Sequence, residues 1–412
     1  MNNVLDVYLH DLLVGQLSQN SSGDISFYYD NNYVVQNRPS ISVSLPLSKV
    51  SYHGDIVKAF FSGLLPDDIV RHKLAKCLGI SEQNTFALLE AIGGECAGAL
   101  SLYPQGTTPP KQEIGDIEVL DDKKLKEILD LLKRQPLLVG QDNVRLSLAG
   151  AQDKIAISLK DGKVALVKGT TPTTHILKPL IDGVKDSVYN ELFCMRLAAL
   201  VGIDVPNTEV KIVNNTPYFL IERYDRVKKN GIIKRLHQED FCQALGLLPY
   251  LKYESERGPN LKKCEELLLN YSARPAIDRV NFLNRIIFNY LIGNADAHGK
   301  NFSLIYRGVK PELAPAYDLL STASYPGLST RMAMKIGGEY EPNKVCLDHW
   351  YKIVPNTEFA KKNIGITLSI IAEKTLEKAD FLKHNLKQIG IKSSIFNDIC
   401  NIISERSKRV KY

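Results

Sequence analysis

The alternation of apolar and polar residues in the first hundred positions predicts short strands followed by helices. Apolar residues recur with period two in several stretches, which turn-forming residues such as NSSG separate, as is typical of half-buried strands. Strands are expected over residues 4–10, 12–18, 24–30, 33–36 and 40–47. From Ile56 to Leu64 the apolar spacing becomes helical and ends before Pro66, and further helices are expected over 67–80 and 81–92.

The rest of the chain separates into a second strand-rich stretch and a mainly helical stretch. Residues 104–115, PQGTTPPKQEIG, concentrate proline, glycine and threonine and are the best candidate for a linker. A helix is expected over 121–135, strands over 144–159, 163–169, 174–180, 209–213 and 217–225, and a long helix over 187–203. From Gln238 onward the pattern is almost wholly helical, apart from a loop-rich stretch over 294–340.

These patterns predict an α+β fold built from three consecutive regions. We expect a small β-rich N-terminal domain with helices over 1–105, a second strand-rich region over 106–235 and a mostly helical region over 236–412. A strand-rich part followed by a larger helical part favours a bilobal arrangement with a cleft between the lobes.

The composition is that of an ordinary globular protein and restricts the function only slightly. At about 150 residues per domain, 412 residues suggest two or three domains. A hydrophobic content of 44% and a charged content of 24% argue against a disordered chain, a collagen or a coiled coil. The net charge of +6 is a weak preference for anionic partners and does not by itself predict nucleic-acid binding.

The start of the chain and its cysteines favour a cytoplasmic protein. The first residues, MNNVLDVYLHDLLVGQL, lack the basic segment and apolar run of a secretory signal, and no stretch approaches the roughly 20 apolar residues of a membrane span. The seven cysteines are scattered and never form a CxxC pair, so we expect buried thiols in a reducing compartment instead of disulfides or zinc ligands.

The most informative segment is NYLIGNADAHGKNFSLIY, residues 289–306, which places Asp296 and Asn301 in a D-x4-N arrangement. The same spacing occurs in the catalytic loop of protein kinases, where the aspartate accepts the proton of the substrate hydroxyl and the asparagine holds a metal ion. Asp318 follows a short apolar strand further on, in the position of a second metal-binding aspartate. Two such loops suit Mg²⁺ bound to phosphates. The alternative is that both aspartates are helix caps or turn residues.

A lysine and a glutamate upstream complete the order of residues that phosphate chemistry needs. Lys178 ends the strand HILKP, from which its ammonium group could neutralise nucleotide phosphates, and Glu191, at the start of a helix, could orient that lysine. The alternative for Lys178 is a solvated lysine on a strand edge.

Two further segments are candidates for contacts to a nucleotide. The small residues of SLAGAQDK, residues 147–154, would let backbone N–H groups approach phosphates, although a plain hairpin turn would have the same composition. The strand PYFLIERYDR, residues 217–226, runs out into charged residues between the two expected lobes, as would a hinge whose backbone meets an adenine or an ordinary strand end. Motifs for zinc hydrolysis, serine hydrolysis and dinucleotide binding (HExxH, GxSxG and GxGxxG) do not occur in the sequence.

Taken together, these motifs resemble the HipA-type serine/threonine kinases, which are the toxins of HipBA-type toxin–antitoxin pairs. The segments that carry the resemblance are VRLSLAGAQDK, PTTHILKP, NELFCMRLA, ERYDR, HQEDFCQALGL, KYES, LIGNADAHGKNFS and PAYDLLS. The N-terminal stretches SVSLPL and FFSGLLPDDIVR resemble the small N-terminal domain of that family. The resemblance runs in order from about residue 4 to about residue 400.

The resemblance implies a bilobal, protein-kinase-like fold and a set of site residues. Asp296 matches the catalytic base, Asn301 and Asp318 match the magnesium ligands, and Lys178 matches the lysine that contacts the ATP phosphates. The ATP contacts that it implies are Ala149, Gly150, Ala151, Gln152, Asp153 and Lys154 in the phosphate loop, Glu222, Arg223 and Tyr224 in the adenine hinge, and His298, Gly299, Lys300, Asn301, Tyr317 and Asp318 near the catalytic loop.

The resemblance also implies a mode of self-regulation. Ser147 matches the serine that such kinases autophosphorylate, which in the family expels the phosphate loop and inactivates the enzyme. A phosphate group with nearly two negative charges cannot remain packed beside the phosphates of ATP. Asp318 is followed by Leu-Leu in place of Phe-Gly, so regulation by a flipping phenylalanine is not expected.

The implied activity is that of a toxin kinase. With ATP and Mg²⁺ it would phosphorylate a serine of a translation component, an aminoacyl-tRNA synthetase and foremost the glutamyl type, and so arrest growth. Its implied partner is a HipB-like helix-turn-helix antitoxin, with which it would repress its own operon. Operator DNA would then be contacted only through the antitoxin, and no membrane partner is implied.

Two other functions remain open from the sequence. The chain could act as a kinase-silent co-repressor that binds the antitoxin on operator DNA. It could also be a small-molecule kinase, because antibiotic and sugar phosphotransferases share the D-x4-N arrangement and a later aspartate.

Overall fold

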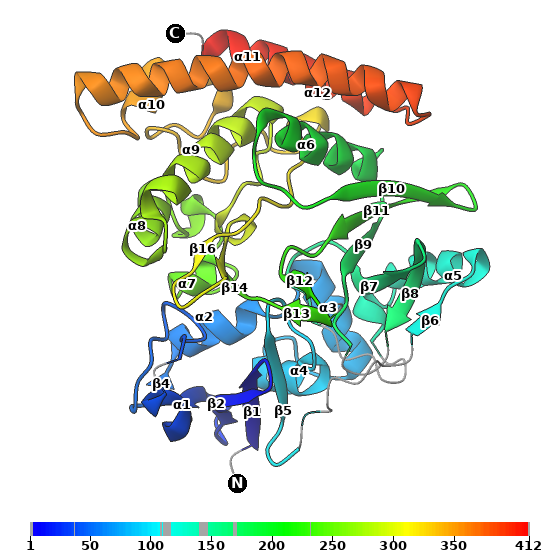
Figure 1. The fold of residues 1–412 in the computed structure, drawn as a ribbon, viewed down its shortest axis with the longest axis vertical. Coiled ribbons are helices and arrows are strands. Elements are labelled where there is room, and N and C mark those ends of the chain that lie inside the picture. The colour runs from blue at the N-terminus through cyan, green and yellow to red at the C-terminus, as the bar shows by residue number, and fades with distance from the viewer. Residues whose placement is uncertain are drawn as a thin grey trace. The chain divides into compact units, whose positions relative to one another are not determined.

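The computed structural model, drawn as a ribbon in Figure 1, describes residues 3–36, 38–107, 109, 117–139, 147–167, 171–230 and 232–410. The chain divides into two compact units. Unit 1 consists of Met1–Pro179, Lys211–Leu251 and Ser303–Ala314, and unit 2 consists of Leu180–Val210, Lys252–Phe302 and Pro315–Tyr412. Each unit is therefore assembled from three separate stretches of the chain. The three consecutive regions expected from the sequence stay a prediction.

Unit 1 begins with an antiparallel sheet whose strand order is β4-β3-β2-β1-β5. Its strands are β1 (Asn3–Leu9), β2 (Leu12–Gln19), β3 (Ile25–Tyr29), β4 (Tyr52–His53) and β5 (Leu100–Pro104), and the helices of this region are α1 (Asn31–Val35), α2 (Asp55–Gly63), α3 (Asp68–Leu78) and α4 (Thr85–Ile92). The expected strands that correspond to β1, β2 and β3 and the expected helices that correspond to α2, α3 and α4 are confirmed.

Two of the strands expected in this region are wrong. Residues 33–36 belong to the end of α1, which forms because the Asp30 side chain accepts hydrogen bonds from the backbone N–H groups of Asn32 and Tyr33. Residues 40–47 contain only an isolated bridge between Ser42 and Leu45. The backbone N–H of Val43 donates instead to the side chain of Glu239, which takes it out of any strand ladder.

A second sheet of unit 1 has the strand order β10-β11-β9-β7-β8-β6. Its strands are β6 (Ile117–Val119), β7 (Ile155–Lys160), β8 (Lys163–Val167), β9 (His175–Pro179), β10 (Thr208–Val213) and β11 (Thr216–Glu222), and helix α5 (Asp122–Leu132) and the turn η1 (Pro136–Leu138) come between β6 and β7. The structure confirms these strands and α5, except that the strand expected over 144–159 begins only at Ile155. Residues 144–146 of that expected strand lie outside the described residues.

Two smaller sheets were not expected from the sequence. One is the ribbon of β12 (Arg226–Lys229) and β13 (Ile232–Arg235), and the other has the order β14-β15-β16, formed by β14 (His237–Asp240), β15 (Ser303–Tyr306) and β16 (Glu312–Leu313) with the short helix α7 (Phe241–Ala244) after β14. In the second sheet Gln238 pairs with Ile305. Strands of four residues or fewer that pair across such a separation leave little periodic signal in a sequence.

The apolar core of the N-terminal sheet extends into the segment that precedes β7. Leu148 and Ala156 belong to the same buried cluster as the apolar side chains of β1, β2, α2 and α4. A second cluster joins α5 to the sheet of β7, β9 and β11. Residues 147–154 are therefore anchored on the N-terminal core, because Leu148 is buried in it.

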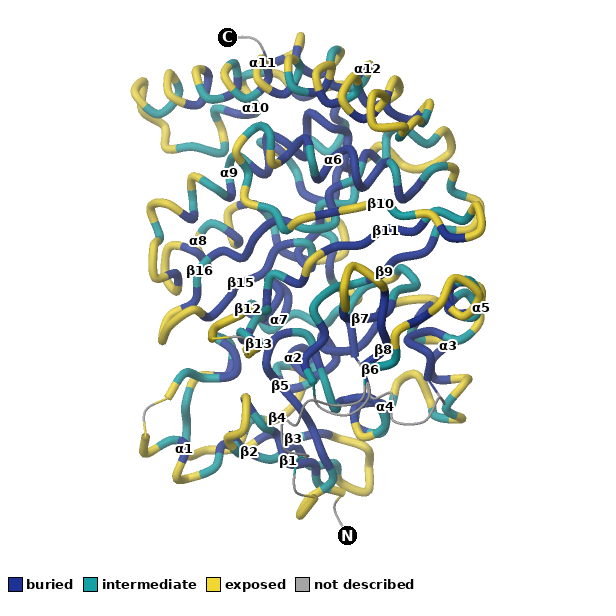
Figure 2. Tube along the Cα trace, turned by 45° about the vertical axis from the view of Figure 1, so that its right-hand side comes forward, coloured by how far each residue is buried: buried dark blue, intermediate teal, exposed yellow. Residues whose placement is uncertain are grey.

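Unit 2 is mainly helical. Its helices are α6 (Ser187–Val201), α8 (Leu261–Tyr271), α9 (Pro275–Ile292), α10 (Leu347–Tyr351), α11 (Glu358–Gln388) and α12 (Ile395–Arg409), with the short turns η2 (Glu254–Glu256), η3 (Gly299–Asn301), η4 (Thr322–Ser324) and η5 (Pro342–Lys344). Helix α11 packs against α6, α9 and α12, and its trace alternates between buried and exposed residues (Figure 2). Phe193 of α6 stacks on Phe396 of α12 with 5.0 Å between ring centroids.

The two units together confirm the α+β class expected from the sequence, with sheets concentrated in unit 1 and helices in unit 2. Within the described ranges, every helix is too short or too polar to cross a membrane. All seven cysteines lie in described segments as free thiols. Cys77 and Cys346 are exposed, which corrects the expectation that the cysteines are buried.

Candidate functional site

The loop that carries Asp296 begins where helix α9 ends. Gly293 follows α9 in the left-handed region with φ of 79°, a conformation that glycine adopts without strain. A Cβ atom at this position would lie 2.9 Å from the Cβ of Ala323. Gly293 therefore both terminates the helix and lets the loop after Asp318 approach it.

Asp296 is held by hydrogen bonds while its side chain remains 43% exposed. The Tyr253 hydroxyl donates to Oδ1 of Asp296 at 2.5 Å, and the backbone N–H of Asp296 donates to Oδ1 of Asn294 at 3.0 Å. Nε2 of His298 lies 4.0 Å from the same Oδ1. The carboxylate is thus both accessible and restricted in orientation, which is the combination that a general base requires.

A direct hydrogen bond joins the two residues of the D-x4-N arrangement. Nδ2 of Asn301 donates to the backbone carbonyl of Asp296 at 2.8 Å. This bond assigns the amide nitrogen to the loop, so that Oδ1 is the atom of Asn301 left to act as a ligand.

Asp318 lies on a second loop that is bonded to the first. The backbone N–H of Ala295 donates to Oγ1 of Thr322 at 2.8 Å, and the N–H of Ala323 donates to the carbonyl of Gly293 at 3.0 Å. Asp318 itself has φ of 58°, a left-handed conformation that is uncommon for a residue with a Cβ atom. Unit 2 therefore brings the Asp296 and Asp318 loops side by side.

The other residues of unit 2 that were expected to contact ATP lie beside these two loops. The Tyr317 hydroxyl donates to the carbonyl of Lys300 at 2.6 Å, which ties the segment before Asp318 to turn η3. His298, Gly299 and Lys300 are buried in this turn. Neither aspartate caps a described helix, which removes the helix-cap alternative for that part of the chain, whereas Asp296 does lie in a turn.

The oxygen donors of these two loops fit a magnesium ion. A carboxylate from Asp318 and an amide oxygen from Asn301 are hard ligands of the kind that Mg²⁺ prefers, and they would hold the ion together with water and phosphates. The strained backbone of Asp318 is consistent with a residue that is held for function.

In unit 1, the segment 147–154 is shaped by Gly150. This residue has φ of 111° and bridges Pro66, and its carbonyl accepts a hydrogen bond from the N–H of Asp67 at 3.2 Å. A Cβ atom at position 150 would lie 2.4 Å from Nζ of Lys154, so the lysine folds back over the glycine. Residues 147–149 are not in a strand. The segment is therefore a loop bound to the N-terminal domain.

Ser147 and the strand lysine are both buried. The Ser147 hydroxyl donates to the carbonyl of Leu64 at 2.5 Å, and its backbone N–H donates to the carbonyl of Glu95 at 2.9 Å. Lys178 pairs with Phe219 on β11, and its Nζ lies 5.9 Å from the centre of the Phe219 ring. Because β9 lies between β7 and β11, Lys178 is not a solvated lysine on a strand edge. Glu191 is buried on α6 of unit 2, and its pairing with Lys178 stays a prediction.

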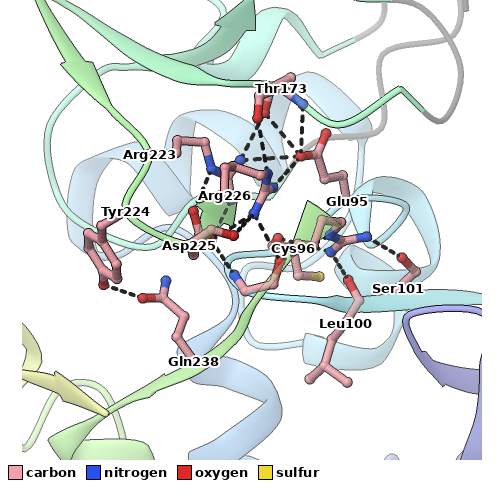
Figure 3. A network of polar contacts seen from close by, with 12 residues as sticks. Glu95, Cys96, Leu100, Ser101, Thr173, Arg223, Tyr224, Asp225, Arg226 and Gln238 are labelled. Atoms are coloured by element: carbon pink, nitrogen blue, oxygen red, sulfur yellow. Dashed lines mark hydrogen bonds and ion pairs between the residues drawn. The ribbon is translucent and has the colours of Figure 1, made fainter. Parts of the chain in front are cut away.

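Of the residues proposed as a hinge, Glu222 is the last residue of β11. Arg223 and Tyr224 follow it and belong to a dense polar network (Figure 3). The Arg223 side chain donates to Asp225 and Glu95, and its backbone N–H donates to the carbonyl of Thr174. The Tyr224 hydroxyl donates to Oε1 of Gln238, and burial raises the pKa of Tyr224 above its usual range. The Arg223 and Tyr224 side chains are thus engaged inside unit 1.

Sequence analysis did not identify Tyr253 or Asn190 as parts of the site. Tyr253 bonds to Asp296, and Asn190 bonds to the loop that follows Asp318. Asn190 on α6 binds both backbone groups of Ser321, because its Oδ1 accepts from the Ser321 N–H at 2.8 Å and its Nδ2 donates to the Ser321 carbonyl at 2.9 Å. A buried asparagine within an apolar helix was the available signal, since such a residue needs polar partners.

Comparisons with known proteins agree with these observations. The model of the HipA-like C-terminal domain family matches residues 146–380, and that of the HipA N-terminal domain family matches residues 5–103. Y4mE of Sinorhizobium fredii, a kinase by name, is 41% identical over 416 residues, which cover 99% of this chain and 98% of the relative. The serine/threonine-protein kinase toxin HipA of Shewanella oneidensis is 32% identical over 357 residues, which cover 83% of this chain and 80% of the relative.

A solved structure extends the similarity to three dimensions. A chain in the complex of HipA, HipB and operator DNA from Shewanella oneidensis MR-1 has a TM-score of 0.80 and 26% identity, covering 98% of this chain and 95% of that chain. The family matches, the relatives and the solved structure agree over nearly the whole length of the chain. The protein therefore belongs to the HipA family of toxin-like kinases.

Proposed function

We propose that the protein is a serine/threonine protein kinase that uses ATP and Mg²⁺. The observation that supports this proposal most directly is the hydrogen bond from the Asn301 side chain to the backbone of Asp296, with the Asp318 loop hydrogen-bonded beside it. Asp296 is the base, and Asn301 and Asp318 hold the metal. Mg²⁺ in such a site neutralises charge on the phosphates.

Residues of unit 1, together with Glu191 of unit 2, complete the proposed nucleotide site. Lys178 contacts the phosphates and Glu191 orients it, while Ala149 to Lys154 form the phosphate loop. The adenine is met by backbone groups of Glu222 to Tyr224, since the Arg223 and Tyr224 side chains are engaged elsewhere. In unit 2 the further ATP contacts are His298, Gly299, Lys300 and Tyr317. This assignment corresponds to a bilobal kinase-like arrangement.

The proposed reaction is a direct phosphoryl transfer. The oxygen of a serine hydroxyl forms a bond to the γ-phosphorus of ATP, the bond from that phosphorus to the bridging oxygen breaks, and ADP leaves with the electron pair. The hydroxyl proton passes to the carboxylate of Asp296. The protein contributes position and charge compensation, which supply most of the rate enhancement in such reactions.

Two kinds of phosphate acceptor are proposed. The first is an aminoacyl-tRNA synthetase, foremost the glutamyl type, whose modification would stop translation and growth. The second is Ser147 of the chain itself. Its hydroxyl is buried against the Leu64 carbonyl, so a phosphate there could not keep the present packing and would displace the loop.

The proposed partner is a HipB-like helix-turn-helix antitoxin. The similarity to a chain from a complex of HipA, HipB and operator DNA supports this partner. Contact with operator DNA is proposed to be indirect, through the antitoxin, so that the pair represses its own operon. The same similarity favours a second candidate function, in which the chain serves as a kinase-silent co-repressor.

Expression without an antitoxin tests the kinase function against the co-repressor function. The wild type is expected to arrest growth and to raise serine phosphorylation of a synthetase in the cell lysate, measured by phosphopeptide mass spectrometry. Asp296→Asn is expected to do neither, whereas Asp398→Asn, an exposed aspartate on α12, serves as the matched control and should behave as the wild type. Equal growth arrest by the wild type and Asp296→Asn would contradict a kinase mechanism and favour the co-repressor.

A further inference from the structure

Tyr253 makes a direct contact with the residue proposed as the catalytic base. Its hydroxyl donates to Oδ1 of Asp296 at 2.5 Å. Its ring meets the imidazole of His298 edge to face, with 5.1 Å between centroids and an interplanar angle of 84°. Both Asp296 and His298 belong to the catalytic loop, so one tyrosine contacts that loop through its hydroxyl and through its ring.

Backbone hydrogen bonds on both sides of Tyr253 fix its position. The carbonyl of Lys252 accepts from the N–H of Gly299 at 3.1 Å, which joins the preceding residue to the catalytic loop. The N–H of Glu254 donates to the carbonyl of Ala333 at 3.1 Å, and the N–H of Ala333 donates to the carbonyl of Ala295 at 2.9 Å. The tyrosine hydroxyl is therefore placed by a scaffold that includes the neighbours of Asp296.

We propose that Tyr253 is a positioning residue for phosphoryl transfer, which holds the Asp296 carboxylate through Oδ1 and directs Oδ2 to the substrate hydroxyl. This inference rests on the proposed kinase function. A carboxylate has two equivalent oxygens and rotates about its Cβ–Cγ bond, and a donor on one oxygen removes that freedom. Productive geometry for proton transfer requires a heavy-atom distance of about 2.6–3.2 Å, so loss of orientation lowers the rate.

The hydrogen bond from Tyr253 to Asp296 can be removed without removing the groups around it. Other charged or titratable groups also face this position. His298 lies 4.0 Å from Asp296, Nζ of Lys252 lies 5.6 Å from the centre of the Tyr253 ring, and Glu254 pairs with Lys335 at 3.8 Å. Removal of the hydroxyl alone leaves all of these groups in place.

Tyr253→Phe is the variant that isolates the hydroxyl, because the ring contacts to His298 and Lys252 are retained. We expect kcat to fall roughly ten- to a hundredfold, the effect of one hydrogen bond to a charged group, with KM for ATP unchanged. Tyr250→Phe removes an exposed tyrosine hydroxyl three residues earlier in the sequence and is expected to leave kcat and KM unchanged.

Further measurements separate this inference from the function on which it rests. If Asp296→Asn abolishes transfer while Tyr253→Phe keeps the wild-type kcat, the positioning role is wrong and the kinase assignment stands. If Asp296→Asn retains transfer, the proposed base is wrong. A double-mutant cycle of Tyr253→Phe and Asp296→Ala in urea unfolding provides a readout without activity, because alanine offers the tyrosine hydroxyl no acceptor. Additive losses of unfolding free energy would overturn the inferred contact, and non-additive losses would support it.

Discussion

Two clusters of charged residues in the described part of the chain differ in exposure and in pairing. Around Asp296 and Asp318 in unit 2, the carboxylates lie on loops, and the side chain of Asp296 is 43% exposed. Around Glu95 in unit 1, which Figure 3 shows, the charged side chains of Glu95, Arg223, Asp225 and Arg226 are at most 13% exposed.

The cluster around Glu95 pairs each carboxylate with two arginines. Glu95 contacts Arg223 and Arg226, and Asp225 contacts the same two residues at 2.8 Å and 3.0 Å. Burial alone would raise the pKa of Asp225, but the charges of Arg223 and Arg226 outweigh it and hold that pKa well below its usual range. These carboxylates remain ionised at neutral pH and cannot take up a proton during a reaction.

The difference between the clusters distinguishes structural from reactive charge. A fully paired buried network joins the N-terminal domain to the end of β11, and its charges are committed to one another. In the Asp296 cluster, the carboxylate of Asp296 is 43% exposed and accepts a hydrogen bond from the Tyr253 hydroxyl, and Asp318 has a left-handed backbone. An accessible carboxylate can meet a substrate or a metal ion, whereas the carboxylates of the buried network are enclosed by their arginine partners.

The largest expected effect that separates the two clusters comes from Asp318→Asn. We expect phosphoryl transfer to fall by about a hundredfold or more, because the substitution removes one charge from the metal site. The unfolding free energy should stay within about 0.5 kcal/mol of the wild type, since asparagine tolerates the left-handed conformation of this position. Steady-state kinetics and urea unfolding of the same preparation check both statements. A large loss of unfolding free energy would show that Asp318 stabilises the fold and is not specific to the reaction.

Glu95→Gln is expected to have the opposite profile. Removal of one carboxylate leaves the buried charges of Arg223 and Arg226 under-compensated, at a cost of about 3–5 kcal/mol in unfolding free energy. The control is Lys126→Ala, which breaks an exposed ion pair with Asp130 on α5 and should cost no more than about 0.5 kcal/mol. Urea unfolding measures both. Equal effects of the two variants would contradict the structural role of the network.

The smallest expected effect concerns a buried carboxyl surrounded by neutral donors. Glu239 accepts hydrogen bonds from Ser42, from the N–H of Val43 and from Tyr306. Burial raises the pKa of Glu239 to about 7, although these hydrogen bonds act in the opposite direction. The folded protein therefore binds a proton that the unfolded chain releases above about pH 4.

The sign of the pH effect follows from this difference. The contribution of Glu239 to the unfolding free energy is complete below about pH 4, falls as the pH rises towards 7 and is constant above, with a total change on the order of 3 kcal/mol. Glu239→Gln should remove this slope. Urea unfolding between pH 5 and pH 8 checks it, and an unchanged slope in the variant would show that another group titrates.

The sequence predicts elements better than it predicts the contacts between them. Helices such as α2 and α6 follow their apolar periodicity, and the strands of the second sheet follow theirs. Residues 40–47 were wrongly expected to form a strand, because their partner is the side chain of Glu239, which lies far away in the sequence. Local periodicity contains no information about such a partner.

The candidate site shows the same limit. The D-x4-N spacing and the later Asp318 are visible in the sequence, since one loop must present both residues at a fixed separation. Tyr253 and Asn190 were missed because they reach the site from other segments through single hydrogen bonds. Arg223 matched the hinge by resemblance, yet only the structure shows that its side chain is engaged with Asp225 and Glu95.

The most direct test of the kinase assignment is intact-mass spectrometry of the wild type and of Asp296→Asn. Both purified proteins are first treated with phosphatase, which is then removed, and are afterwards incubated with ATP and Mg²⁺. The account predicts one added phosphate on the wild type alone, at Ser147, since the acceptor serine and the base belong to the same chain. If neither protein gains phosphate, or if both gain it equally, the assignment of Asp296 as the base of a self-modifying kinase is contradicted.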